Sequence, residues 1–208
     1  MSDSEYTFYN DLPKVIKDVS SFPTPYSIEI ASGNFHVQQP TDKWIHTDCC
    51  LHNSQLEENH LEMLCYSWHI PLGAGTCKEL IARGFWEHLS YHEVGITLKE
   101  WARVLIPGGV AIFNYPPVDH AIHMLTQKHA DLQWFLRAIY GWQFQERDIH
   151  RSGWTEEWFR KYMSDRADFV IEEVFWGDSR AEDGIPRRAD YDPWVTVGAH
   201  QWVILRRL

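Results

Sequence analysis

Long apolar runs are missing from this chain. No stretch approaches the roughly 20 residues that a membrane helix needs, and residues 1–10 lack the basic start and apolar run of a signal peptide. Cysteine is also scarce. The four thiols include the adjacent Cys49 and Cys50, and a chain of 208 residues does not need disulfide bonds to hold a core. We therefore expect a cytoplasmic protein with reduced thiols and no membrane partner.

Basic residues are few: 19 Lys and Arg stand against 29 Asp and Glu, for a net charge of −10. No run of Lys and Arg is longer than two residues. Because an acidic chain repels a phosphate backbone, we expect no nucleic-acid partner.

Aromatic residues are abundant by contrast, at 14% of the chain with 11 Trp. This content predicts rings that line a pocket or an interface in addition to the core, which leaves a homodimer open. Trp134, Trp142 and Trp154 are the rings that we consider for an acceptor pocket.

The order of hydrophobic patterns predicts an α/β protein. Short β-like runs, seven in all, are expected at 26–31, 43–48, 61–66, 77–84, 110–113, 169–176 and 201–206. Amphipathic stretches predict helices at 11–19, 94–105, 119–139 and 155–163, and residues 177–200 form a long loop. We predict a Rossmann-like, doubly wound, mostly parallel seven-stranded sheet with helices on both faces and an antiparallel edge strand. Residues 1–25 would be a leader, and 26–208 a single domain.

Candidate binding residues follow the predicted strands. In an open parallel sheet, ligands bind at the carboxyl ends of the strands. Gly33 follows the first strand and Asp48 the second, where a carboxylate can accept hydrogen bonds from a ribose diol. Residues 85–88 follow the fourth strand, and Tyr115 the fifth. We expect these groups to converge on one cleft.

Several of these segments resemble the class I S-adenosylmethionine-dependent methyltransferases, and most closely a bacterial subgroup of small predicted members. The most specific piece is the helix that ends in Trp-x-Arg-Val-Leu-x-Pro-Gly-Gly before a strand, preceded by Glu-His-Leu. The matching segments are 28–33, 44–48, 87–89, 98–109 and 150–155.

The resemblance implies that the cofactor is S-adenosyl-L-methionine, and it implies roles for individual residues. The implied cofactor-binding residues are Glu29, Ala31 and Gly33 for the methionine part, Asp48 for the ribose, Ser67 and Trp68 for the adenine, and Glu87 beside the methyl group. The first motif of the family usually reads acid-x-Gly-x-Gly-x-Gly, whereas here Ala31 replaces the first glycine and Phe35 the last.

Methyl transfer needs alignment of the two reactants, and a base only if the acceptor must lose a proton. We take His88 and His150 as candidate catalytic residues, because histidine titrates near neutral pH. Tyr115, Arg151 and Trp154 are candidate substrate-binding residues, with Arg151 able to pair with a carboxylate or phosphate.

We predict no metal site. His46, Cys49, Cys50 and His52 do not have the spacing of a zinc ligand set. His120 and His123 lie one helical turn apart, and we interpret them as part of a solvated face.

The sequence thus favours a methyltransferase that acts on a small-molecule or sugar-like acceptor, such as a glycan precursor. One alternative is a catalytically impaired binding or regulatory protein that keeps the methyltransferase fold, and the altered glycine loop motivates it. A further alternative is another doubly wound protein, such as a nucleotide-sugar or dinucleotide enzyme.

Overall fold

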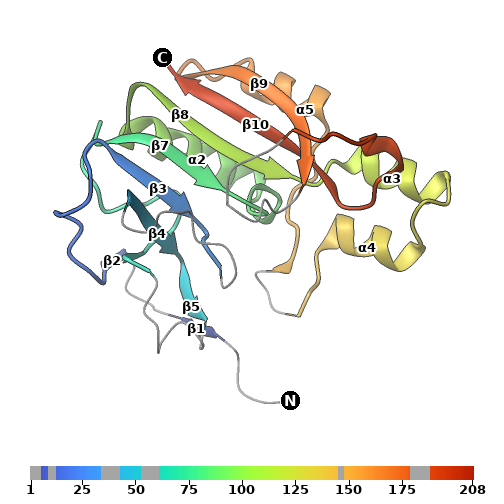
Figure 1. Ribbon diagram of the computed structural model, residues 1–208, viewed down its shortest axis with the longest axis horizontal. Helices are drawn as coiled ribbons and strands as arrows, with labels where there is room; N and C mark the ends of the chain where they lie inside the picture. Colours follow the sequence, from blue (N-terminus) through green and yellow to red (C-terminus); the bar gives the residue numbers. More distant parts are fainter. Residues whose placement is uncertain (1–5, 9–12, 34–42, 53–60, 145–147, 179–187) are drawn as a thin grey trace.

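An eight-stranded sheet organises the chain, whose computed structural model describes residues 6–8, 13–33, 43–52, 61–144, 148–178 and 188–208. The strands run in the order β2-β6-β4-β3-β7-β8-β10-β9 across the sheet (Figure 1). Their bounds are β2 Lys14–Val15, β3 Tyr26–Ile30, β4 Trp44–Asp48, β6 Met63–Leu64, β7 Cys77–Ala82, β8 Leu105–Tyr115, β9 Phe169–Asp178 and β10 Ala199–Arg207. A separate antiparallel pair joins β1 (Tyr6–Phe8) to β5 (Cys50–His52).

The centre of the sheet is parallel, as the sequence predicts. β3 pairs in parallel with β4 and with β7, so that Ile28 lies opposite both Ile45 and Leu80. β7 pairs in parallel with β8, and β6 with β4. The carboxyl ends of these strands therefore meet at one edge of the sheet.

Two details of the predicted sheet are wrong. The sheet has eight strands and not seven, because Lys14 and Val15 of the expected leader pair with β6 in antiparallel fashion where a helix was predicted. The strand antiparallel to its neighbours near the other edge, β10, is not the edge strand: it lies between β8 and β9 and is antiparallel to both.

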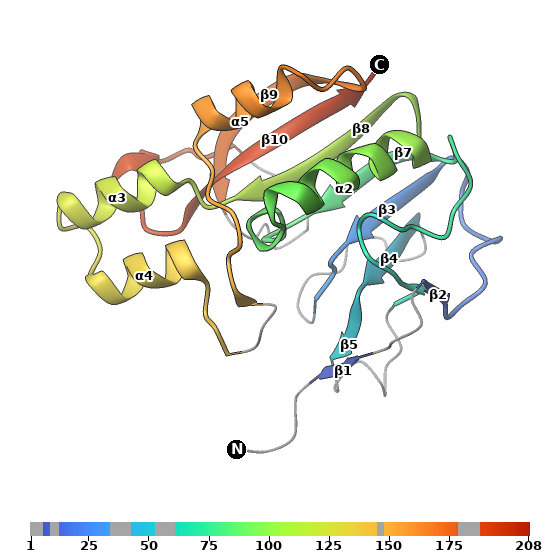
Figure 2. The ribbon, with the colours of Figure 1, turned by 180° about the vertical axis from the view of Figure 1, so that it is seen from behind.

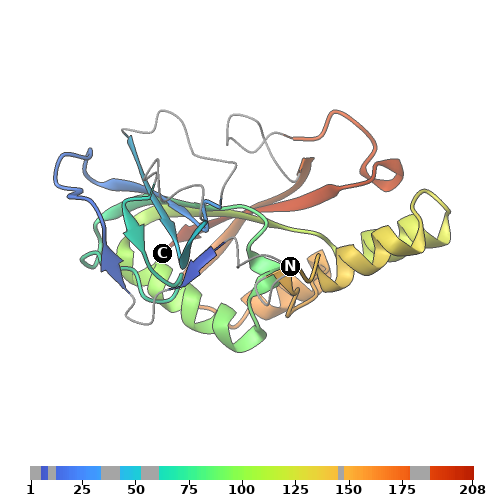
Figure 3. The same ribbon diagram turned by 90° about the horizontal axis from the view of Figure 1, so that it is seen from below.

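Helices α2 (Tyr91–Val104) and α5 (Glu156–Met163) lie against the same face of the sheet (Figures 2 and 3). Helices α3 (Val118–Thr126) and α4 (Leu132–Tyr140) extend beyond the carboxyl end of β8 (Figure 1). Within the described ranges no helix covers the opposite face, so the prediction of helices on both faces is not met there. In that part of the chain, no helix has the length and apolar character needed to span a bilayer.

Helix α2 begins at a capping box. The Ser90 hydroxyl accepts a hydrogen bond from the backbone of Glu93, whose side chain accepts one from the Ser90 backbone. Val94, Leu98 and Trp101 are buried at spacings of four and three residues, which gives the helix its apolar face. The helix ends at Val104, and the Pro-Gly-Gly segment that was expected to end it lies within β8.

The stretch at 119–139, predicted as one helix, forms two. Lys128 has a backbone φ of +61°, which ends the helical path after α3. Asp131 then caps α4 by accepting a hydrogen bond of 2.7 Å from the Trp134 N–H. The predicted closing strands and the helix at 155–163 are confirmed as β9, β10 and α5, and the long loop contains a short 3-10 turn at Pro193–Val195, η4.

Aromatic rings fill the core under α2 and α5. Trp86 stacks on Phe113 with ring centroids 4.0 Å apart. Within 6.3 Å of the Trp86 ring centroid lie the ring centroids of Trp101, Trp154 and Phe159. Fully burying Trp86 fixes the short 3-10 helix η2 (Trp86–His88) that follows β7. This packing positions Glu87 and His88 at the carboxyl end of the sheet.

Candidate functional site

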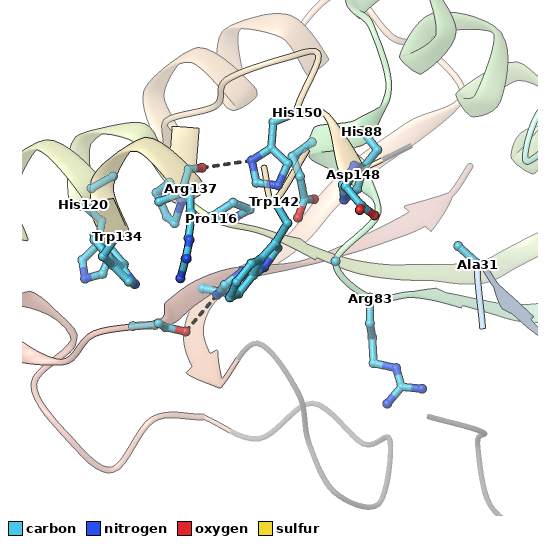
Figure 4. A pocket seen from close by; sticks show the side chains of 18 of the residues that line it. Ala31, Arg83, His88, Pro116, His120, Trp134, Arg137, Trp142, Asp148 and His150 are labelled. Atoms are coloured by element: carbon cyan, nitrogen blue, oxygen red, sulfur yellow. Dashed lines mark hydrogen bonds between the residues drawn. The ribbon is translucent and has the colours of Figure 1, made fainter. Parts of the chain in front are cut away.

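A cleft of about 740 Å³ opens at the carboxyl ends of β3, β7 and β8, with α3 and α4 along one side (Figure 4). Its lining comes from five regions of the chain. It consists of Ala31, Ser32, Gly33, Arg83, Gly84, Glu87, His88, Pro116, Pro117, His120, Ala121, Trp134, Arg137, Ala138, Trp142, Asp148, His150, Gly198, Ala199 and His200.

The ends of β3 and β4 are joined directly beside this cleft. The Gly33 N–H donates a hydrogen bond of 3.0 Å to Asp48 Oδ2, while Asp48 Oδ1 accepts one of 2.7 Å from the Cys49 N–H. Asp48 does not line the cleft itself. Oδ1 also accepts a hydrogen bond of 3.3 Å from the Cys50 N–H and lies 3.7 Å from Cys50 Sγ. A carboxylate oxygen has about two lone-pair positions, so the acceptor capacity that Asp48 retains is on Oδ2, beside Gly33.

The turn after β3 has an unusual backbone. Ala31 and Gly33 both have positive φ, at +54° and +60°. The left-handed region is favourable for glycine and costs an alanine about 1–2 kcal/mol. A Cβ built on Gly33 would meet no atom within 4 Å, so the backbone of this turn stands open toward the cleft.

A buried charge network lies behind this turn. The Glu29 carboxylate is 1% exposed and forms an ion pair with the Arg83 guanidinium, which lines the cleft. His46 Nε2 lies 3.7 Å from Glu29 Oε2, and His46 Nδ1 lies 3.0 Å from Glu62 Oε2. Glu29 is therefore covered by Arg83 and reaches the cleft only through it.

Glu87, His88 and His150 meet at the base of the cleft. The two imidazole rings are 4.9 Å apart and nearly perpendicular. The backbone oxygen of Glu87 accepts hydrogen bonds from the N–H groups of Arg151 and Ser152, at 2.8 and 3.1 Å, which ties the segment before α5 to η2. The three side chains offer ligand atoms that all lie within 4.8 Å of one another.

Burial changes the protonation of two members of this cluster. It raises the pKa of Glu87 to about 8, against an opposing contribution from a backbone hydrogen bond. Burial and the neighbouring His88 lower the pKa of His150 to about 4. At neutral pH both groups are therefore mainly uncharged.

Aromatic and basic groups line the other end of the cleft. Trp134 and Trp142 come from α4 and the segment after it, and the Arg137 guanidinium lies 4.3 Å from the Trp142 ring centroid (Figure 4). The interpretation of His120 as part of a solvated face is wrong. Its ring is buried next to Trp176, and His120 Nε2 lies 2.8 Å from the Pro193 oxygen.

Seven predicted site residues do not line the main cleft: Glu29 and Asp48, which lie behind it, and five that point elsewhere, Ser67, Trp68, Tyr115, Arg151 and Trp154. The Ser67 hydroxyl bonds Thr97 at 2.9 Å, and Trp68 packs on the core. Tyr115 is fully buried with its hydroxyl on Gln201, and Trp154 is 1% exposed with Nε1 on the Ser152 hydroxyl.

The Arg151 side chain lies outside the main cleft. Its guanidinium forms an ion pair with Glu93 at 2.7 Å, and it lines a smaller adjoining hollow of about 160 Å³. In four of these five, Ser67, Tyr115, Trp154 and Arg151, the polar group already bonds a protein partner, and the Trp68 ring stacks on Tyr66 with centroids 4.8 Å apart.

Arg83 and Arg137 are lining residues without an assigned role in the sequence prediction, whereas Trp134 and Trp142 had been considered for an acceptor pocket. Arg83 comes directly after β7, so the rule that ligands bind at strand ends could have identified it. Arg137 belongs to α4, which the sequence pattern did not separate from α3.

Several solved structures that this chain resembles in fold are described as methyltransferases. A SAM-dependent methyltransferase from Methanosarcina mazei is 12% identical with a TM-score of 0.53, over 88% of this chain and 92% of that one. One from Thermotoga maritima, described as a possible histamine N-methyltransferase, is 12% identical with a TM-score of 0.51, over 88% and 82%. A methyltransferase from Haloferax volcanii, solved with the Trm112 activator, is 14% identical with a TM-score of 0.51, over 93% and 85%.

No family model matches the chain, and no curated protein matches its sequence. At these identities the structural likeness shows the fold, which is that of the SAM-dependent methyltransferases. The bacterial subgroup suggested by the sequence is not established by it.

Proposed function

We propose that this chain binds S-adenosylmethionine beside β3 and β4 and transfers its methyl group to a small acceptor in the cleft. The observation that carries the proposal is the junction between Gly33 and Asp48. It places an open backbone turn and a carboxylate together at the strand ends where the fold binds ligands.

The residues present fit the adenosyl group. Asp48 would accept the ribose hydroxyls, and the turn from Ala31 to Gly33 leaves room for the ligand to approach the backbone. Arg83, paired with Glu29, presents a cation to the same part of the cleft and would attract the carboxylate of the methionine part. When bound, the cofactor supplies an electrophilic methyl group.

The acceptor would lie between Trp134, Trp142 and the pair of histidines. Flat indole faces suit an aromatic or sugar ring, and Arg137 suits an anionic substituent on it. We therefore propose a small aromatic or sugar-like acceptor that carries a carboxylate or phosphate. His88 and His150 remain candidates for receiving its proton, since both line the cleft.

Calorimetry with S-adenosylhomocysteine tests the cofactor assignment. Asp48→Ala should weaken binding at least about tenfold, roughly 1.4 kcal/mol, because the ribose loses its acceptor. Asp165→Ala, which removes an exposed carboxylate after α5, should bind as the unchanged protein does. Asp48→Asn keeps the shape of the side chain and separates loss of charge from collapse of the turn. Equal affinity in all of these proteins would refute the assignment.

A second candidate function rests on Ala31. An alanine held at positive φ strains the turn that receives the cofactor, which favours a protein that keeps the fold without turnover. If S-adenosylhomocysteine binds but a broad panel of anionic aromatic and sugar acceptors is never methylated, this binding or regulatory function is the better description.

A further inference from the structure

One carboxylate and two imidazoles converge in the cleft. Glu87 and His88 come from η2, and His150 from the segment before α5. Figure 4 shows the rings of His88 and His150 near each other. Among the residues that the structure describes, no other group of three such side chains brings its ligand atoms within 4.8 Å of one another. The sequence had predicted no metal site, and it did not consider this set, in which His150 lies more than 60 positions after the other two.

Both imidazoles are oriented through the same nitrogen. His88 Nδ1 lies 3.2 Å from the Ile149 oxygen, and His150 Nδ1 lies 3.0 Å from the Ala138 oxygen. A carbonyl only accepts, so each Nδ1 carries the proton and each Nε2 carries the lone pair. Metal-binding histidines are held in this way, with one ring N–H on a backbone carbonyl or a carboxylate.

The surroundings of the Glu87 carboxyl group also favour a bound cation. Glu87 is 4% exposed, and its Oε2 atom has no hydrogen-bond partner within the described part of the chain. A buried carboxyl oxygen without a hydrogen-bond partner is costly whether or not the group carries its proton, and buried polar groups are nearly always satisfied. A cation at this position would satisfy it.

The frame around the three side chains is rigid. The hydrogen bonds from the Arg151 and Ser152 backbone to the Glu87 oxygen join the two segments, and the buried Trp86 anchors η2 beneath them. A site whose ligands are held before binding loses little conformational entropy when the ion arrives.

We propose that Glu87, His88 and His150 bind one divalent transition-metal cation in the cleft. Two imidazoles and one carboxylate are a donor set that suits Zn²⁺, Mn²⁺ or Fe²⁺ and leaves coordination positions open to the cleft. Ligand atoms at about 2.1 Å from one ion lie about 3–3.5 Å apart, so side-chain rotation must close the set by about 1 Å.

The proposal goes beyond methyl transfer and does not require it. With the ion bound, the lone pairs of both histidines would be engaged in coordination. Neither ring would then take the proton of an acceptor, and the ion itself would bind and polarise an acceptor oxygen.

Titration of metal-stripped protein with Mn²⁺, followed by electron paramagnetic resonance and calorimetry, tests the site. We expect one ion per chain. Glu87→Gln, His88→Ala and His150→Ala should each weaken binding at least about tenfold. His129→Ala is the matched control. It removes the exposed ring of His129, whose centroid lies 6.3 Å from that of the half-buried His123, and it should leave the affinity unchanged.

Two further measurements keep the outcome decisive. Thermal unfolding shows whether the buried Glu87→Gln variant is folded, and the half-exposed His88 provides a variant that does not disturb the core. Asp48→Ala should retain Mn²⁺ even where it loses S-adenosylhomocysteine, so a failure of either proposal is distinguishable from a failure of the other. The metal proposal is wrong if the unchanged protein binds neither Mn²⁺ nor Zn²⁺, or if His88→Ala binds Mn²⁺ as tightly as the unchanged protein.

Discussion

Ala31 stands at a backbone position that favours glycine. Its φ of +54° lies in the left-handed region, two residues before Gly33 at +60°. The Cβ of an alanine in this region raises the conformational energy by about 1–2 kcal/mol, whereas glycine has no Cβ and no such cost. The neighbouring Ser32 N–H donates to the Thr47 oxygen at 3.0 Å, which helps to hold the turn against this strain.

Ala31→Gly should therefore stabilise the protein by about 1 kcal/mol, or about 2–4 °C in melting temperature, although glycine usually destabilises. Urea unfolding and calorimetry measure the change. Ala74→Gly, in an exposed loop where the alanine does not have positive φ, should have the opposite sign. A loss of stability for Ala31→Gly would show that the turn carries no strain.

Single site residues were predictable where chain position alone decides their place. Gly33 and Asp48 follow adjacent parallel strands, so the sequence could bring them together. Tyr115 also ends a strand, but its side chain points into the aromatic core. The direction of the last residue of a fully buried strand depends on packing, because both faces are apolar and the alternation of side chains gives no signal.

At the scale of elements, Glu62 connects the strands β4, β6 and β2 at the β2 edge of the sheet. Its carboxylate accepts hydrogen bonds from the His46 backbone and ring, at 2.9 and 3.0 Å, and lies 3.3 Å from the Lys17 ammonium. Burial opposes the charge, but the hydrogen bonds from His46 outweigh it and hold the pKa of Glu62 below its usual value. This carboxylate ties β4 to the residues that flank β6 and β2.

Because the pKa of Glu62 is lowered on folding, its ionised form stabilises the native state above the unfolded value of about 4.5. That stabilisation should fade as the pH falls below 4.5. Glu62→Gln should cost about 1 kcal/mol at pH 7 and progressively less in acid. Urea unfolding of both proteins across this range measures the difference, and Glu157→Gln controls for removal of an exposed carboxylate. A constant difference at every pH would contradict the assignment.

Elements with strong periodicity were predictable, and their boundaries were less so. The apolar stripe of α2 and its Ser90 cap identify that helix from sequence. The break between α3 and α4 was missed because Asp131 was treated as a helical residue when it is an N-cap. The pairing of Lys14 and Val15 with β6 depends on a partner about 50 residues away, which local patterns do not report.

At the scale of the whole molecule, the net charge of the chain is negative, whereas the cleft contains basic groups. The chain carries a net charge of −10, yet the cleft is lined by two guanidinium groups, of which that of Arg83 is paired with Glu29, and by one further acid, Asp148, besides Glu87. The Arg137 guanidinium favours a small anionic ligand, while the net acidity of the chain disfavours a polyanion. This contrast supports a small acceptor over a nucleic acid.

Cofactor binding should stabilise the whole fold, because its residues come from strands on both sides of the sheet centre. S-adenosylhomocysteine at a hundred times its dissociation constant should add about 2.7 kcal/mol, which corresponds to a rise of about 5–10 °C in melting temperature. A thermal-shift assay measures it, with NAD(H) as the control ligand. A shift with NAD(H) and none with S-adenosylhomocysteine would point to a dinucleotide enzyme in place of a methyltransferase.

The overall architecture followed from the alternation of strands and helices, but the place of β10 did not. A hairpin of β9 and β10 can attach to β8 through either strand, and the sequence does not distinguish the two.

The order of these strands in the sheet differs from the order in which the ribosome makes them. β9 is translated before β10, but in the folded sheet β10 lies between β9 and β8 (Figure 1). Until β10 has been made, the ten residues of β9 lack their native partner strand, so their hydrogen-bonding edges are open to other chains. We expect non-native pairing of the nascent chain in that interval, and a chaperone that covers β9 would reduce it.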